Sequence, residues 1–348
     1  MLRWKSPSNP FLGGVIPPFR GRGPSAARTE GEALGRSGGR ISLALLWMML
    51  VLGLVLIGCG PEKPKASAPV ARPKVIATTS ILADVVKSLG GAQVEVETLM
   101  PAGVDPHLYK PTAGDASKIS EAKLVLSHGL ELEGRMGDIL GNLPATTKSL
   151  VVGDTLPKER LRPIPGQANK YDPHVWLDVS LWMLIIDPIV ASLSEVVPEG
   201  KTTFELNAKN LKADLTRLHG VVQKQIEQIP AANRVLVTAH DSFGYFGRAY
   251  GLEVKAIQGV STAAEAGVQR MQELSQFLTD RKVPAIFTES SIPPANIKAL
   301  KEATSAKGWT VREAGPLFSD SLGDEKSGAA TYFDMMVANA TAISLALR

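Results

Sequence analysis

Three of the five histidines stand in settings that suit metal ligands. His107 lies in GVDPHLYKP (residues 103–111), His174 lies in YDPHVWLD (171–178), and His240 ends the apolar run VLVTAH (235–240). Asp-Pro-His thus occurs twice, and in each copy the proline fixes φ just before the imidazole, which helps a side chain to hold one direction. Imidazole is the commonest metal ligand in proteins. Taken singly, each histidine fits a cap or a packed core position better than a ligand position, so only the three together indicate a metal site.

Two carboxylates could complete such a site. Asp320, in GPLFSDSL (315–322), follows the last expected strand and could be a fourth ligand, although a simple turn aspartate would look the same. Glu289, in AIFTESS (285–291), could orient a histidine through its other ring nitrogen, and a capping or surface role is the alternative. His128 and His219 are left out of the predicted site, because nothing beside them indicates ligation.

The elements around these residues predict an α/β fold with two similar lobes and mostly parallel sheets. Short apolar, β-branched runs bounded by turn residues alternate with helical patterns. Asp172 is expected to cap the helix that follows it, with Pro173 in the first position. Parallel sheets bind ligands at the carboxyl ends of their strands, where His107 and His240 are expected, while His174 is expected at a loop–helix junction. The first lobe's strands are predicted at 75–79, 94–99, 124–127 and 150–153, with a helix at 81–89; the second lobe's are predicted at 234–239, 253–257, 285–288 and 310–314, with a helix at 264–279.

A long helix is predicted between the lobes, from about residue 198 to 228. Its apolar residues recur every three or four positions: Phe204, Ala208, Leu211, Leu215, Leu218, Val222 and Ile226. About thirty residues at roughly 1.5 Å each span about 45 Å, which is longer than one small lobe is wide. Such a strut would restrict wide opening of the lobes.

The amino-terminal segment predicts export and a membrane anchor. Residues 1–58 carry seven Lys or Arg and two Glu, a net charge of +5. The whole chain has a net charge of +4, so the other 290 residues carry 4 − 5 = −1. A body with this charge offers no basic surface for nucleic acid. Residues 41–58 are apolar and uncharged, and LIGC (56–59) resembles a lipobox whose Cys59, the only cysteine, would be lipidated. A permanent membrane helix with an incidental cysteine is the alternative.

The predicted organisation is a tail with signal peptide (1–58), a linker (59–73), the first lobe (74–197), the linking helix (198–229) and the second lobe (230–348).

Five motifs in this order, GVDPHLYKP, YDPHVWLD, TAHDSFGYFGRAYGL, FTESS and GPLFSDSLG, resemble the metal-binding solute-binding lipoproteins of zinc and manganese ABC transporters (solute-binding protein family 9, cluster A-I). The resemblance covers nearly all of residues 74–348. It implies two α/β lobes bridged by one long helix and metal in the cleft between them. It also implies ligands at His107, His174, His240 and Asp320, and delivery of the ion to a membrane permease. Together with the amino-terminal segment, this predicts a lipid-anchored, extracytoplasmic protein, which we expect to be a monomer.

Zinc is the favoured ion, and manganese is the alternative. Three imidazoles and one carboxylate suit Zn²⁺, whereas Mn²⁺ prefers more oxygen, and manganese-selective members of the family generally place Glu at the position of His240. Many zinc carriers bear a His-rich loop, however, and residues 141–170 contain no histidine. A zinc hydrolase would need an open coordination position, and the chain has no His-Glu-x-x-His motif. An adhesin would leave the histidine placement unexplained, so a binding protein without enzymatic activity is predicted.

Overall fold

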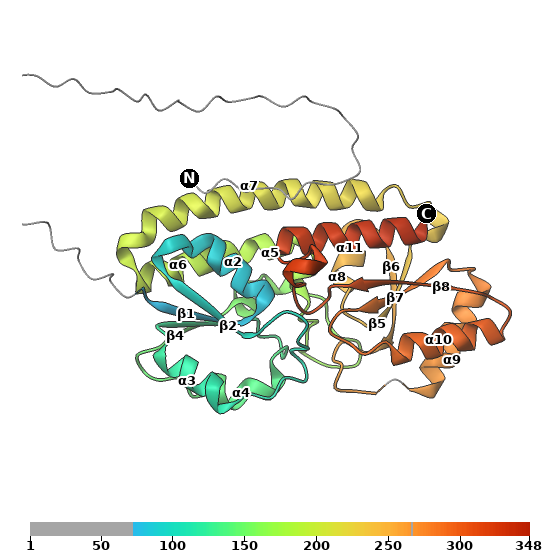
Figure 1. Ribbon diagram of the computed structural model, residues 1–348, viewed down its shortest axis with the longest axis horizontal. Coiled ribbons are helices and arrows are strands. Elements are labelled where there is room, and N and C mark those ends of the chain that lie inside the picture. Colours follow the sequence, from blue (N-terminus) through green and yellow to red (C-terminus); the bar gives the residue numbers. More distant parts are fainter. Residues whose placement is uncertain (1–71, 266) are drawn as a thin grey trace, which may run out of the picture. The chain divides into compact units, whose positions relative to one another are not determined.

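The computed structural model of the protein describes residues 72–265 and 267–348 (Figure 1). The basic tail, the apolar segment 41–58, Cys59 and the linker as far as residue 71 lie outside the described residues. The described chain forms two α/β lobes with parallel strands, which confirms the predicted fold class.

The amino-terminal lobe is built on a parallel sheet of order β2-β1-β3-β4. Helices lie on both faces of this sheet, with α2 and α6 on one side and α3 and α4 on the other (Figure 1). β4 begins two residues earlier than predicted, because Leu124 pairs with Lys148 and the chain turns into a 3₁₀ helix at Val152. The strands are β1 (Lys74–Thr79), β2 (Glu95–Met100), β3 (Leu124–Ser127) and β4 (Lys148–Val151), and the helices are α2 (Ser80–Gly90), α3 (Ala113–Glu121), α4 (Gly137–Gly141), α5 (Val179–Trp182) and α6 (Ile186–Val196).

The carboxy-terminal lobe contains two pairs of parallel strands, with β5 packed beside β7. Its backbone hydrogen bonds therefore form two short ladders instead of one continuous sheet, and the register of β7 against β8 shifts between Phe287 and Glu289. Helix α9 begins at Val268, four residues later than predicted. The strands are β5 (Val235–His240), β6 (Glu253–Gln258), β7 (Ala285–Glu289) and β8 (Arg312–Leu317), and the helices are α8 (Gly244–Tyr250), α9 (Val268–Asp280), α10 (Ala295–Ala306) and α11 (Tyr332–Leu347).

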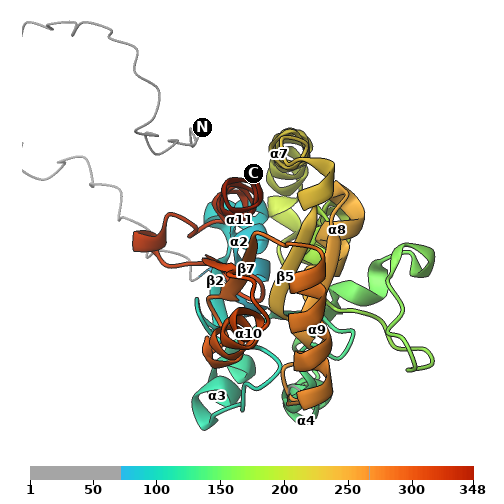
Figure 2. The same cartoon turned by 90° about the vertical axis from the view of Figure 1, so that its right-hand side faces the viewer.

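Helix α7 (Lys201–Ile226) runs along one side of both lobes, as the two views in Figures 1 and 2 show. Its 26 residues span about 39 Å, close to the predicted length. It packs on α2, α5 and α6 in one lobe and on α8 and α11 in the other. Six of the seven apolar positions that predicted this helix are buried, and Leu211 is partly buried. The helix thus joins the two lobes through one continuous apolar contact.

The stretch Val179–Val196, which contains α5 and α6, is long and apolar enough to cross a membrane. Its residues Ile186, Ile189 and Leu193 are fully buried, however, and α6 packs against α7. A helix whose apolar side is covered by the rest of the fold is typical of a protein core, and we interpret this stretch as such.

Truncation of Leu218 on α7 is expected to destabilise the protein by about 2–5 kcal/mol, because the side chain is fully buried and Leu218→Ala would leave a cavity in the shared core. Leu206→Ala on the same helix is the control: that side chain is 58 % exposed, so its loss should change the free energy of unfolding by no more than about 0.5 kcal/mol. Urea unfolding of the two metal-free variants measures the difference. Equal losses would mean that the buried face of α7 does not stabilise the fold.

Candidate metal centre

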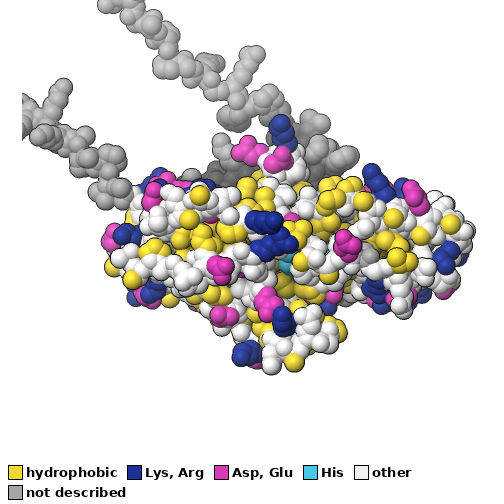
Figure 3. Space-filling model, turned by 90° about the horizontal axis from the view of Figure 1, so that it is seen from below, with side chains coloured by type: hydrophobic (Ala, Val, Ile, Leu, Met, Phe, Trp, Pro, Cys, Tyr) yellow, Lys and Arg dark blue, Asp and Glu magenta, His cyan; other side chains and the backbone are white. Residues whose placement is uncertain are grey.

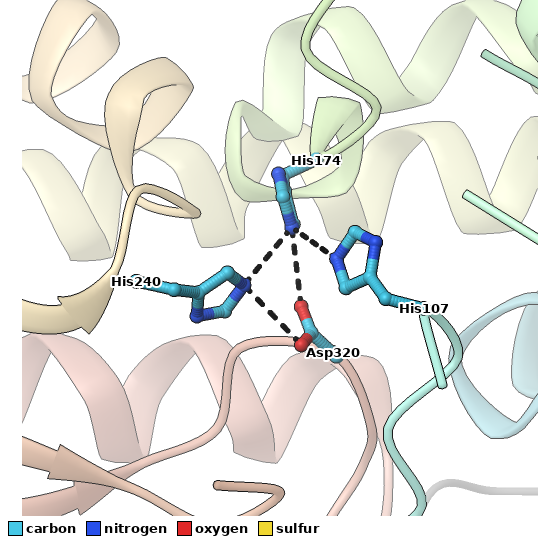
Figure 4. A group of neighbouring side chains, drawn as sticks. All are labelled: His107, His174, His240 and Asp320. Atoms are coloured by element: carbon cyan, nitrogen blue, oxygen red, sulfur yellow. Dashed lines mark hydrogen bonds and ion pairs between the residues drawn. The ribbon is translucent and has the colours of Figure 1, made fainter. Parts of the chain in front are cut away.

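Four side chains from distant parts of the chain converge between the lobes: His107, His174, His240 and Asp320 (Figure 4). His107 lies on the loop after β2, His174 precedes a short 3₁₀ turn, His240 ends β5, and Asp320 follows β8. All four are buried, and one ligand atom from each lies within 4.8 Å of the other three. The structure therefore brings together the residues that the sequence singled out.

The distances between these ligand atoms fit a single small cation. Nε2 of His174 lies 3.3 Å from Nε2 of His107 and 3.2 Å from Nε2 of His240. The oxygens of Asp320 lie 3.3 Å from Nε2 of His174 and 3.3 Å from Nε2 of His240. Ligands at about 2.0–2.1 Å from a tetrahedral zinc ion lie about 3.3 Å from one another, which these four distances match. The widest separation in the group, up to 4.8 Å, would have to shorten for one ion to contact all four donors.

The carboxylate of Asp320 gives an independent indication of a cation. Both of its oxygens are buried, and neither has a hydrogen-bond partner among the described residues. Their polar neighbours are Nε2 of His174 and Nε2 of His240 at 3.3 Å, and a buried carboxylate with no closer partner costs free energy, which a cation between Asp320 and the imidazoles would offset.

Two carboxylates fix the orientation of two of the imidazoles. Oδ1 of Asp172 lies 2.7 Å from Nδ1 of His174, and Oε2 of Glu289 lies 2.7 Å from Nδ1 of His240. Glu289 also accepts a hydrogen bond from the backbone N–H of His240 at 2.9 Å. A carboxylate behind Nδ1 directs Nε2 toward the centre and increases its strength as a donor. Glu289 thus lies behind an imidazole of the cluster, and its role in orienting His240 stays a prediction.

The prediction that Asp172 caps a helix is wrong. Its Oδ1 instead accepts a hydrogen bond from the backbone N–H of His174 at 2.9 Å, and the cap of α5 is Asp178. The reason is that a 3₁₀ turn, Val175–Leu177, separates His174 from the helix. In the other Asp-Pro-His motif, Asp105 accepts the N–H of His107 at 2.8 Å in the same way. In both motifs the aspartate stands two residues before the histidine. This repeated spacing in the sequence was the signal that could have predicted that each aspartate binds the backbone of its histidine.

Sequence reasoning also missed Trp176, which connects the lobes beside the site. Its indole N–H donates to the backbone oxygen of Ser319 at 2.7 Å, next to Asp320. Its own backbone oxygen accepts a hydrogen bond from the hydroxyl of Tyr332, at 2.5 Å. The segment that carries His174 is thereby held against the segment that carries Asp320.

The charges of the site favour a cation at its centre. Burial disfavours the charged form of His174, but the carboxylates of Asp172 and Asp320 outweigh it and raise its pKa to about 9. His240 follows the same pattern, since Glu289 and Asp320 overcome burial and raise its pKa well above the ordinary value. Burial would raise the pKa of Asp320, yet His240 and His174 hold it well below its usual range. For His107 burial prevails and lowers the pKa to about 3.

The two remaining histidines lie apart from the cluster. His128 is buried, with Nε2 2.7 Å from the hydroxyl of Thr79 and its ring stacked on Trp182. His219 on α7 has Nδ1 3.2 Å from the hydroxyl of Tyr250. Neither belongs to the group whose ligand atoms converge.

Residues 75–346 match the model of the family described as "Zinc-uptake complex component A periplasmic". The manganese-binding lipoprotein MntA of Bacillus subtilis is 41 % identical over 304 residues, which is 87 % of this chain and 99 % of that protein. The zinc-binding protein TroA of Treponema pallidum is 42 % identical over 299 residues, covering 86 % of this chain and 96 % of its own. The solved structure of TroA superposes with a TM-score of 0.77 over 80 % of this chain and 99 % of that one.

Metal binding is expected to release protons and to weaken as the pH falls. His174, with its pKa near 9, and His240 hold protons in the metal-free site at neutral pH, and each must lose its proton before Nε2 can bind an ion. Competition by protons therefore begins below pH 9. Calorimetric titration with Zn²⁺ in buffers of different ionisation enthalpy should show release of at least about one proton per ion at pH 7.5, and at least about tenfold weaker binding at pH 6.0. Affinity that is independent of both pH and buffer would contradict the assignment.

Proposed function

The chain belongs to the family of the periplasmic zinc-uptake complex component A, and we propose that it captures a divalent metal ion outside the cytoplasm and delivers it to the permease of an ABC transporter. The observation that carries this proposal is the convergence of four buried donor groups from two lobes on one point. Relatives of this chain are named as a manganese-binding lipoprotein and as a manganese ABC transporter substrate-binding lipoprotein.

Binding of the ion is favoured over catalysis with it. Four protein donors would fill a tetrahedral shell, whereas a catalytic zinc ion keeps one position for water or substrate. The carboxylates nearest to the group, Asp172 and Glu289, lie behind imidazoles and so are not placed to act as a base on a bound water. The family consists of transport proteins and not of enzymes.

We propose zinc as the preferred ion and manganese as the alternative. Three neutral imidazoles and one carboxylate form a nitrogen-rich group with a charge of −1, which suits Zn²⁺, while Mn²⁺ prefers more oxygen donors. Four of the six distances between donor atoms are 3.2–3.3 Å, which fits the short bonds of zinc. The two relatives at 41–42 % identity are named for different ions, so identity alone does not decide between them.

The proposed arrangement in the cell rests on the sequence before the described residues. We propose that residues 1–58 direct export and that Cys59 carries a lipid that holds the chain at the outer side of the cytoplasmic membrane or in the periplasm. Residues 59–73, which are rich in Pro, Ala and Lys, would form a semi-extended tether. A monomer with lobes at 74–197 and 230–348, linked by residues 198–229, would present the ion to the permease.

Replacement of one proposed ligand should abolish tight binding. His174→Ala is expected to weaken Zn²⁺ binding by on the order of 100-fold or more, because it removes a donor from a four-ligand shell. His219→Ala is the matched control and should bind like the unaltered protein, since His219 lies outside the cluster. The measurement is elemental analysis of the purified proteins, followed by competition of Zn²⁺ and Mn²⁺ for the metal-free chain, in which Zn²⁺ should win. Equal losses of zinc affinity in His174→Ala and His219→Ala would contradict the assignment of His174 as a ligand.

A further inference from the structure

His107 differs from the other two imidazoles of the cluster in how it is held. Nδ1 of His174 and Nδ1 of His240 each face a carboxylate at 2.7 Å, but no described carboxylate lies behind Nδ1 of His107. His107 is also the most exposed of the four, at 5 % against 0–1 % for the others. The position of its ring therefore depends mainly on the loop that carries it.

That loop is attached to the opposite lobe by two hydrogen bonds. The hydroxyl of Thr262, between β6 and α9, donates to Oδ2 of Asp105 at 2.7 Å. The backbone N–H of Gly103 donates to the hydroxyl of Ser321 at 2.9 Å. Oδ1 of Asp105 meanwhile accepts the N–H of His107. One carboxylate thus connects a side chain of the carboxy-terminal lobe directly to the backbone of a proposed ligand in the amino-terminal lobe.

These bonds lie where the site meets solvent. A cavity of about 280 Å³ is bordered by His107, Leu130, Glu131 and part of the segment 164–173 of one lobe, and by residues 259–261 and Ala264 of the other. Thr262 belongs to this last segment. In the view from below, a small patch of histidine surface is visible between the two lobes (Figure 3). An ion that leaves the cluster toward this cavity must pass His107.

We propose that Asp105 and Thr262 form a latch that positions His107 and sets the rate at which a bound ion leaves. The proposal rests on the function proposed above and adds to it two residues that touch no ion. While the latch is closed, the backbone of His107 is held at the junction of the lobes, and the imidazole stays in the coordination shell. When the lobes separate at this edge, the Thr262 hydroxyl leaves Asp105, the loop loses its attachment, and His107 is the first ligand that can withdraw. Asp172 and Glu289 keep the other two imidazoles in place.

The test is the rate of zinc release from the loaded full-length protein after mixing with excess EDTA. Thr262→Val removes the hydroxyl and keeps the shape of the side chain. Zinc should dissociate about tenfold faster, the change expected for the loss of one hydrogen bond to a charged group, while the association rate constant stays within about twofold. Thr147→Val is the matched control, because the hydroxyl of Thr147 donates to the backbone oxygen of Ala122 within one lobe. Its release rate should equal that of the unaltered protein.

A second variant separates the latch from a general loss of packing. Asp105→Asn keeps the side-chain shape but removes the charge that Thr262 contacts, so it should also accelerate release, and it should add little when combined with Thr262→Val. Unchanged release in Thr262→Val, additive effects in the double variant, or the same acceleration in Thr147→Val would each overturn the latch. A failure of the proposed function is seen separately, since the unaltered protein would then not bind zinc stoichiometrically before any release is measured.

Discussion

The structure depends on one electrostatic constraint, which is a buried carboxylate, Asp320, whose oxygens lie 3.3 Å from two imidazole nitrogens and have no other polar partner among the described residues. Asp320 faces Nε2 of His174 and Nε2 of His240 at the junction of the two lobes, His107 lies beside them, and the residues involved span 320 − 107 = 213 positions of the chain. A cation at their centre satisfies the carboxylate and the imidazoles together, and it binds the lobes to each other. Without a cation, protons on His174 and His240 balance part of the charge. A metal ion and these protons therefore compete for the imidazole nitrogens of His174 and His240.

The fold holds the proposed metal site with some parts that are rigid and with one ligand loop that can move. Helix α7 and the core beneath it join the lobes on one side, and Trp176 and Tyr332 connect them beside the site. His174 and His240 are fixed by carboxylates, whereas His107 is fixed through its backbone and a hydrogen bond between the lobes. Such an arrangement combines firm binding with a defined place at which release can begin, and a delivery protein requires both properties.

Much of the fold and most of the proposed site could be predicted from the sequence, because the signals are local. The spacing of apolar residues predicted α7, and the position of the histidines at strand ends or loop–helix junctions predicted their convergence. What could not be predicted depends on contacts between distant segments or on turn geometry. Thr262 meets Asp105 across 157 positions, and Asp172 orients His174 because a 3₁₀ turn intervenes where a helix start was expected. The register of β4 and the division of the second sheet into two pairs likewise follow from pairing between strands.

X-ray absorption spectroscopy of the zinc-loaded protein tests the central claim most directly, because it reports the type and distance of the atoms around the ion. We predict three imidazole nitrogens and one or two carboxylate oxygens at about 2.0–2.2 Å, with the multiple scattering that is typical of imidazole rings. A shell dominated by water oxygens, or one with a single imidazole, would contradict the conclusion that His107, His174, His240 and Asp320 hold the ion together.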